Sequence, residues 1–167
     1  MIHINKFPNY STTRLLTKQE PFLEHSFYNQ FKQALFLPES SKRIAEGGLR
    51  REGYFKQSII NKPLLSIVTV VFNGNKFLEE TIQSVLNQTY DNVEYIIIDG
   101  GSTDGTLDII KKYNRAIDYW ISEADNGLSD ALNKGFMLST GEWLFYLNSD
   151  DTLYSDYLLE DIFYKKS

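Results

Sequence analysis

The fold is decided by residues 64–72, which read LLSIVTVVF. These residues are apolar and rich in β-branched side chains, with almost no polar alternation, which is typical of a strand covered on both faces. Directly after them, residues 76–88 place Leu78, Ile82 and Val85 on one stripe at helical spacing. A buried strand followed by an amphipathic helix predicts the first unit of a layered α/β domain.

The same alternation continues along the rest of the chain. Apolar, strand-like runs recur at residues 93–98, 117–121 and 142–147, and helical spacing recurs at residues 104–113, 127–138 and 155–164. Alternating strands and helices favour right-handed crossovers and a mostly parallel sheet with helices on both faces. The sequence therefore predicts one α/β domain over residues 63–167.

Residues 1–62 differ from the rest of the chain in composition and pattern. All four prolines of the chain lie at or before residue 63, and the glycines at 47 and 48 indicate a loop. One helix is expected at residues 24–37, where Phe27, Phe31 and Leu35 recur at four-residue spacing. No chemical motif is visible here. We therefore expect a partly helical N-terminal extension that packs against the main domain or against a partner.

The composition of the 167 residues narrows the functional classes. The absence of cysteine excludes a disulfide scaffold, a cysteine-based metal centre and a thiol nucleophile. A net charge of −5 disfavours nucleic acid as a partner, because its phosphates attract basic surfaces. The longest apolar run, residues 64–72, is well short of the roughly 20 residues that span a membrane. Since no signal peptide is visible either, we expect a cytoplasmic protein without a transmembrane segment.

Polar residues gather where each expected strand ends. These strand exits are residues 72–74, 99–105, 122–127 and 148–151, and three of the four contain acidic side chains. Ligands of open parallel sheets bind beyond the carboxyl ends of the strands. Because an acidic rim repels a bare phosphate, a phosphate ligand here requires a divalent cation. The adjacent Asp150 and Asp151 suit Mg²⁺ or Mn²⁺, which prefer oxygen ligands; the alternative is that they only cap a helix or form a turn.

Other residues near these exits have both a functional and a structural interpretation. Asp99 opens a glycine-rich loop and is able to accept hydrogen bonds from a ribose or a base, but the same glycines also suit a tight turn. Phe72 is able to stack on a base or to belong to the core. Asn133 and Lys134 are placed to reach phosphates, although Lys134 also suits a solvated helix face. Asp104 is expected to cap the helix that follows it.

Several common nucleotide-binding and catalytic motifs are absent. The chain has neither G-x-G-x-x-G after a strand nor G-x-x-x-x-G-K-[ST], which excludes ordinary dinucleotide and P-loop sites. No G-x-S-x-G elbow is present. Both histidines, His3 and His25, lie in the N-terminal extension, so the α/β domain has no histidine-based site. A receiver-like signalling domain also uses acidic strand ends, but no later strand is left to carry the lysine that it needs.

Three segments carry a resemblance to a known family. In order along the chain they are LSIVTVVFNGNKFLEETIQSVLNQTYDNVEYIIIDGGSTDGT at 65–106, SEADNGLSDALNKGF at 122–136 and STGEWLFYLNSDD at 139–151. Their order and spacing resemble the donor-binding half of family 2 glycosyltransferases, especially bacterial enzymes that build surface polysaccharides. The stretch GGLRREGYF at 47–55 is similar to a lead-in that some of these enzymes carry. The resemblance implies a Rossmann-like GT-A half at residues 63–167 that binds a nucleotide sugar.

The resemblance also implies roles for single residues. Phe72 would stack on the base, Asp99 would bind the base or ribose, and Asp150 would contact ribose or sugar. The full set implied for nucleotide-sugar binding is Phe72, Asn73, Asp99, Asp130, Asn133 and Asp150. Asp151 would bind the metal, Mn²⁺ or Mg²⁺. The D-x-D-like signature of the family reads Ser149-Asp150-Asp151 here and lacks its first carboxylate, and position 132 is leucine where many members have arginine.

The implied reaction is an inverting transfer of a sugar from a nucleotide sugar, most commonly a UDP-sugar, to a saccharide or lipid-linked acceptor. In the family the catalytic base and the acceptor-binding segments follow the D-x-D region, so the base is expected beyond Ser167 and none is assigned in this chain. The alternative is a non-catalytic nucleotide-binding remnant or one half of a split enzyme. An uncovered sheet edge would favour self-association. The location would be cytoplasmic or peripheral at the inner face of the membrane.

Overall fold

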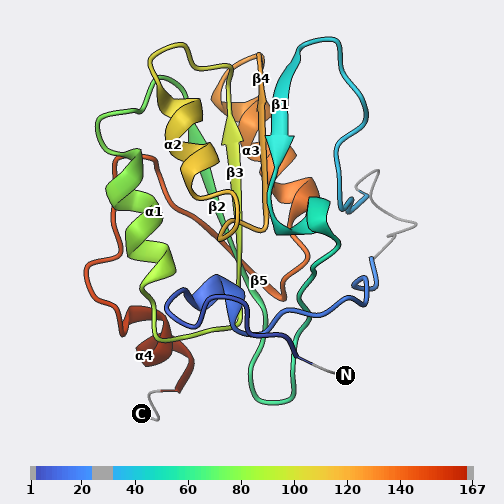
Figure 1. Ribbon diagram of the computed structural model, residues 1–167, viewed down its shortest axis with the longest axis vertical. Helices are drawn as coiled ribbons and strands as arrows, with labels where there is room; N and C mark the ends of the chain where they lie inside the picture. Colours follow the sequence, from blue (N-terminus) through green and yellow to red (C-terminus); the bar gives the residue numbers. More distant parts are fainter. Residues whose placement is uncertain (1–2, 24–31, 165–167) are drawn as a thin grey trace.

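The computed structural model describes residues 3–23 and 32–164. Within these residues the chain forms one five-stranded sheet with the strand order β1-β4-β3-β2-β5 (Figure 1). The strands are β1 Arg43–Gly47, β2 Leu65–Val71, β3 Val93–Asp99, β4 Tyr119–Glu123 and β5 Trp143–Tyr146. The strands β2 to β5 pair in parallel, whereas β1 pairs antiparallel with β4. The strand order reverses between β2 and β5, which is where open α/β sheets place their ligands.

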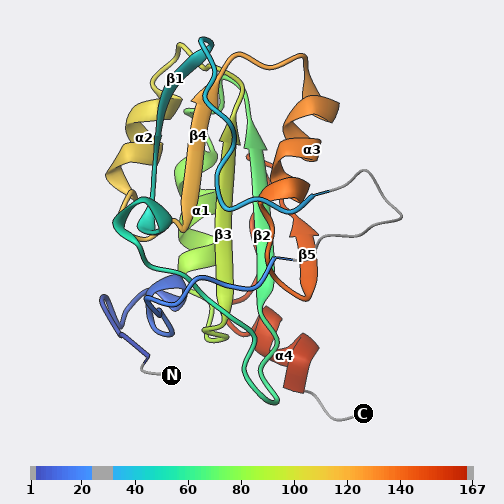
Figure 2. The ribbon, with the colours of Figure 1, turned by 90° about the vertical axis from the view of Figure 1, so that its right-hand side faces the viewer.

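Helices cover both faces of this sheet, as Figure 2 shows. The helices are α1 Leu78–Leu86, α2 Thr106–Lys112, α3 Leu128–Leu138 and α4 Leu158–Tyr164. Apolar residues of α1, α2 and α4 share one core with Ile67 and Ile97, while α3 packs on the opposite face against Val68 and Ile96. The expected α/β class is confirmed. Each strand and helix expected between residues 64 and 164 is present, with ends shifted by no more than three residues.

The contact between α3 and the sheet is unusually close. Gly135 lies against β2, and a Cβ atom added to it would overlap the side chain of Val68. Because glycine has no side chain, the helix backbone approaches the strand directly at this point. This packing helps to fix α3 over β2 and β3, with the helix beginning just beyond the carboxyl ends of the strands.

The N-terminal extension differs from the expectation in part. Residues 24–31 of the expected helix lie outside the described residues, and the prediction is wrong for residues 32–37, which are not helical. Tertiary contacts occupy this segment instead: Ala34 donates its backbone N–H to the carbonyl of Met137, and the ring of Phe36 packs edge-on against Tyr119. Such contacts override a local periodic pattern. The sequence also did not indicate β1, which adds residues 43–47 to the edge of the sheet.

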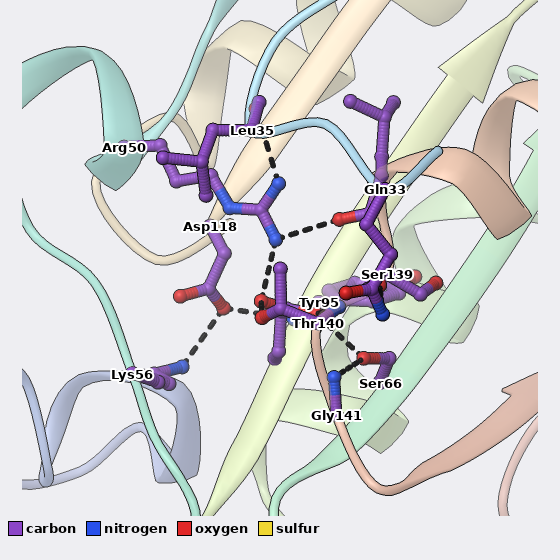
Figure 3. Close-up of polar contacts among 12 residues, drawn as sticks. Gln33, Leu35, Arg50, Lys56, Ser66, Tyr95, Asp118, Ser139, Thr140 and Gly141 are labelled. Carbon is purple, nitrogen blue, oxygen red and sulfur yellow. Dashed lines mark hydrogen bonds and ion pairs between the residues drawn. The ribbon is translucent and has the colours of Figure 1, made fainter. Parts of the chain in front are cut away.

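Two buried ion pairs join the N-terminal extension to the sheet (Figure 3). Arg50 lies in the short 3₁₀ helix Leu49–Glu52 and pairs with Glu94 of β3. Lys56 Nζ lies 2.8 Å from Asp118 Oδ2. Burial alone would raise the pKa of Glu94, but Arg50 and hydrogen bonds from Ser66 and Thr140 hold it below its ordinary value. The boundary at residue 62 stays a prediction, and these pairs cross it.

In the second pair the effect of burial outweighs that of the partners. It lowers the pKa of Lys56 and raises the pKa of Asp118, since desolvation disfavours both charges. A backbone hydrogen bond partly offsets the cost of burying this carboxylate, because Asp118 also accepts the N–H of Tyr95 at 2.8 Å.

In the described part of the chain, no helix combines the length and the apolar character needed to cross a bilayer.

Candidate functional site

A cleft of about 580 Å³ lies at the carboxyl ends of the central strands. It is lined by Val70, Val71, Phe72, Gly100, Gly101, Ala124, Asp125, Gly127, Leu128 and Ala131. These residues come from the exits of β2, β3 and β4 and from the first turn of α3. The exits of β2, β3 and β4 therefore shape one cavity, whereas the exit of β5, with Asp150 and Asp151, contributes no residue to its lining.

Phe72 is the most prominent apolar side chain of this cleft. It follows β2 directly, and its side chain is 67% exposed although the strand before it is buried. An aromatic ring that is largely exposed beside an open cavity offers a flat apolar surface. The structural interpretation of Phe72 as a core residue is therefore wrong. Its stacking on a base stays a prediction.

Asn73 ties the exits of β2 and β3 together. Its backbone N–H donates to Ser102 Oγ at 2.7 Å, and its side-chain Oδ1 accepts the backbone N–H of Thr103 at 3.0 Å. Its φ of 51° lies in the left-handed region, which asparagine tolerates better than most residues. Asp104 is engaged nearby, since its Oδ1 accepts the N–H of Thr106, the first residue of α2. The N-cap of α2 is Gly105, so the expectation that Asp104 caps this helix is wrong by one residue. Asn73 thus holds the exits of β2 and β3 together but does not line the cleft, and its contact with a nucleotide sugar stays a prediction.

Asp99 lies beneath the cleft, and its side chain is fully buried. Ser102 donates its hydroxyl and its backbone N–H to this carboxylate, and the Ser122 hydroxyl of β4 donates to Oδ2 at 2.5 Å. These contacts hold the loop that contains Gly100 and Gly101, both of which line the cleft. In this structure Asp99 links β3, β4 and the loop, and a ligand contact by its carboxylate stays a prediction.

The carboxylate that lines the cleft beside Phe72 belongs to Asp125. Asp125 Oδ1 accepts the backbone N–H of Gly127 at 2.8 Å, and a Cβ atom on Gly100 would lie 2.8 Å from Asp125 Oδ2. Sequence reasoning did not single out this residue. The available signal was its place in the acidic exit of β4, but nothing local distinguished it from the other acidic residues there.

The two α3 residues expected to bind the donor occupy different positions. Asp130 Oδ2 accepts the backbone N–H of Asn126 at 3.1 Å and lies 3.2 Å from Lys134 Nζ. The hydrogen bond from Asn126 lowers the pKa of Asp130, and Lys134 lowers it further. Asn133 is exposed and does not line the cleft. Asp130 therefore supports the cleft wall, and donor contacts by either residue stay predictions.

The acidic doublet lies in the exit of β5, beside the exit of β2. Both Asp150 and Asp151 are exposed, and Asn148 Nδ2 donates to Asp151 Oδ2 at 2.9 Å. Thr81 of α1 anchors this loop by donating to the carbonyls of Ser149 at 3.0 Å and Asp151 at 2.8 Å. Ser149 also lies within ordinary contact of the position that a Cβ on Gly74 would take.

The donor set of this doublet limits the kind of metal site that it can form. Within residues 3–23 and 32–164, no group of three or more His, Cys, Asp or Glu side chains is arranged to hold a metal ion. Asp150 and Asp151 fit a hard cation that takes its remaining oxygen ligands from a bound diphosphate and water. They do not fit a cation enclosed by protein ligands alone.

The described residues form a mostly parallel α/β domain with a cleft at its strand exits. Comparison with known proteins places this domain in a family. The profile described as Glycosyl transferase family 2 matches residues 66–164, which is more than half of the chain. The chain therefore belongs to this family, and the predicted GT-A fold is confirmed.

Relatives and solved structures agree with this assignment. The chain is 39% identical over 101 residues to a putative teichuronic acid biosynthesis glycosyltransferase of Bacillus subtilis, covering 58% of this chain and 40% of that protein. It is 35% identical over 102 residues to an uncharacterized glycosyltransferase of Haemophilus influenzae, covering 59% and 41%. Staphylococcus aureus TarS 1–349 superposes with a TM-score of 0.52 at 25% identity, covering 59% of this chain and 31% of that chain. The chain thus spans about two fifths of the length of these curated relatives.

Proposed function

We propose that the strand-exit cleft binds a nucleotide sugar and that this chain is the donor-binding part of a glycosyltransferase. The observation that carries the proposal is the convergence of the exposed Phe72 ring, the Asp125 carboxylate and the glycines of the β3 exit on one cavity. These features suit a nucleoside, because the ring is able to stack on the base, the carboxylate is able to accept hydrogen bonds, and the glycines allow the ligand to approach the backbone closely. Related structures support it: TarS has been solved with UDP and with UDP-GlcNAc.

The donor that we propose is a UDP-sugar, transferred with inversion to a saccharide or lipid-linked acceptor in bacterial polysaccharide biosynthesis. Names of relatives support this direction, since they include a putative teichuronic acid enzyme and a PGL/p-HBAD biosynthesis glycosyltransferase of Mycobacterium bovis. No catalytic base is assigned within this chain. A cytoplasmic location, including the inner face of the membrane, is part of the same proposal.

A divalent cation, Mn²⁺ or Mg²⁺, belongs to this proposal. Asp151, with Asp150 beside it, would hold the ion, which would neutralise charge on the diphosphate leaving group. Asn148 and Thr81 keep this loop in place by hydrogen bonds to the Asp151 side chain and to the loop backbone. A mannosyltransferase of Pyrobaculum calidifontis with the same fold has been solved with GDP-Man and Mn²⁺.

We also propose that copies of the chain self-associate along β5. Its outer side carries exposed Trp143 and Phe145 beside an apolar groove of about 380 Å³ against α4. Trp143 donates its backbone N–H to the carbonyl of Leu64, just before β2, and Leu147 donates to Val68 of β2, so the N–H groups of residues 144 and 146 point away from β2. A two-fold axis at Phe145 would pair two copies of β5 antiparallel. Light scattering should show a dimer that Trp143→Lys abolishes; a monomer at all concentrations would contradict this part of the proposal.

Calorimetric titration of UDP tests the proposed donor site. We expect binding that Mn²⁺ strengthens, and we expect Phe72→Ala to weaken it about tenfold, since stacking of a base on an aromatic ring is worth roughly 1–3 kcal/mol. Phe22→Ala, which truncates another exposed phenylalanine, serves as the control and should leave the affinity unchanged. If the chain bound a nucleotide sugar but transferred the sugar to no acceptor, the non-catalytic alternative would be favoured. No binding of UDP, GDP or dTDP would refute the proposal.

A further inference from the structure

A chain of charged contacts leads from β1 to the wall of the cleft. Arg43 stands directly opposite Glu123 in the β1–β4 pairing, and its Nε and Nη2 atoms each lie 3.2 Å from Glu123 Oε2. The other oxygen of Glu123, Oε1, lies 2.9 Å from Lys134 Nζ. Lys134 also pairs with Asp130, whose Oδ2 accepts the backbone N–H of Asn126. We call the four charged residues, Arg43, Glu123, Lys134 and Asp130, the charge relay.

The charge relay is well shielded from solvent at its centre. The side chain of Glu123 is 7% exposed, that of Arg43 is 13% exposed and that of Lys134 is 15% exposed. Ion pairs in such an environment are screened far less than surface pairs, and their geometry is correspondingly better defined. The contacts with Glu123 and Asp130 raise the pKa of Lys134 although burial opposes this, so the cation is retained.

The relay ends on the part of the cleft that the sheet does not hold directly. Residues 124–127, which we call the cleft loop, connect β4 to α3 and contribute Ala124, Asp125 and Gly127 to the lining. Glu123 precedes this loop and Asp130 follows it. The relay therefore clamps both ends of the loop that presents the Asp125 carboxylate to the cavity.

We propose that Arg43, from the N-terminal extension, is a positioning residue for the nucleotide-sugar cleft. It fixes Glu123, through which Lys134 and Asp130 set the conformation of the cleft loop. Arg43 lies outside residues 66–164, the range that the family profile covers. The identity of the ligand in this inference rests on the proposed function, whereas the effect on the cleft loop does not.

Arg43 also has contacts that hold only the extension. Its Nη2 donates to the carbonyl of Pro38 at 2.7 Å, and its Nη1 lies 3.5 Å from Glu46 Oε2. If Arg43 only held the extension in place, its removal would therefore loosen β1 without changing the affinity for the ligand. Arg51 provides a matched control, because it pairs with the same Glu46 at 3.6 Å but has no contact with Glu123 among those described.

The test compares Arg43→Ala, Arg43→Lys and Arg51→Ala in the full chain. We expect Arg43→Ala to weaken UDP binding in the presence of Mn²⁺ by about tenfold, the lower end of what removal of an orienting partner costs at comparable sites. Arg43→Lys should restore part of the affinity, because a lysine can still reach the Glu123 carboxylate. Arg51→Ala should bind UDP as the wild type does. Melting temperatures report any general loss of stability.

A second readout does not depend on the ligand. Exchange of the Asn126 and Gly127 amide protons with water, measured by NMR without nucleotide, should be faster in Arg43→Ala and unchanged in Arg51→Ala. Unchanged exchange in Arg43→Ala would overturn the inference, as would an equal loss of UDP affinity in Arg51→Ala. If the wild type bound no UDP, the proposed function would fail, and the exchange rates alone would decide whether Arg43 positions the cleft loop.

Discussion

Gly100 and Asp125 lie close together in the lining of the cleft, although they follow different strands. A Cβ atom on Gly100 would lie 2.8 Å from Asp125 Oδ2, which is closer than ordinary van der Waals contact permits. The φ of Gly100 is not in the left-handed region, so an alanine there would meet no backbone strain. An alanine at this position would therefore have to displace the carboxylate at the end of the Asp125 side chain.

Replacing Gly100 by alanine should push Asp125 out of its present position. We expect the Gly100→Ala variant to bind UDP more weakly and to lose about 1 kcal/mol of unfolding free energy, the lower end of what overpacking costs, because the end of a side chain is able to move. In an Asp125→Ala background the same substitution should cost almost nothing, because the clashing carboxylate is gone. Urea denaturation of the four proteins of this cycle provides the measurement. Equal costs in both backgrounds would show that the contact is unimportant.

The acidic doublet should account for the metal dependence of binding. With Asp151→Asn, the gain in UDP affinity on adding Mn²⁺ should largely disappear, whereas affinity without metal should change little. Asp156→Asn, a change at an exposed aspartate further along the chain, is the control. Calorimetry with and without EDTA measures both effects. A full Mn²⁺ effect in Asp151→Asn would place the metal elsewhere.

The close approach of α3 to β2 should make Gly135 intolerant of a side chain. Gly135→Ala would force its methyl group into Val68, and we expect a loss of about 1–3 kcal/mol of unfolding free energy. Val68→Ala should relieve much of this loss in the double variant, although it creates a small cavity of its own. Chemical denaturation measures all three. A Gly135→Ala variant as stable as the wild type would show that the helix sits further from the strand.

Acid should weaken the attachment of the N-terminal extension through Glu94. Its folded-state pKa lies below the ordinary 4.5, so the stability it contributes is present above that value and is lost as pH falls through the folded-state pKa. Below about pH 4.5, the unfolding free energy of the wild type should therefore decline more steeply than that of Glu94→Gln. Glu142→Gln, at an exposed position, should follow the wild type. Parallel pH profiles for all three would contradict this assignment.

The sequence was sufficient for the α/β framework because its signals are local. The strand at residues 64–72 and the apolar stripe of α1 can be recognised from the sequence pattern alone. The strand β1 did not, since RIAEG at an edge is short and half polar, and its position depends on pairing with a strand about 75 residues away. Residues 32–37 are the opposite case. Their sequence has helical spacing, but they are not helical in the structure, because they form contacts with Met137 and Tyr119 instead.

The candidate site was predictable at the level of strand exits and less so at the level of side chains. That Phe72, Asp99 and the Asp150–Asp151 doublet share one edge follows from parallel topology. That Asp99 is covered by Ser102 and Ser122 does not, because the spatial arrangement of three separate segments decides it. The charge relay behind the cleft loop depends in the same way on contacts with a segment that shows no motif.

We propose above that the exits of the parallel strands form one nucleotide-sugar site. A crystal structure of the chain grown with UDP and Mn²⁺ tests it most directly. We expect a uracil ring stacked on Phe72 and a diphosphate directed toward Asp150 and Asp151. A nucleotide bound at another surface, or a cleft left empty at a UDP concentration that saturates binding in solution, would contradict it.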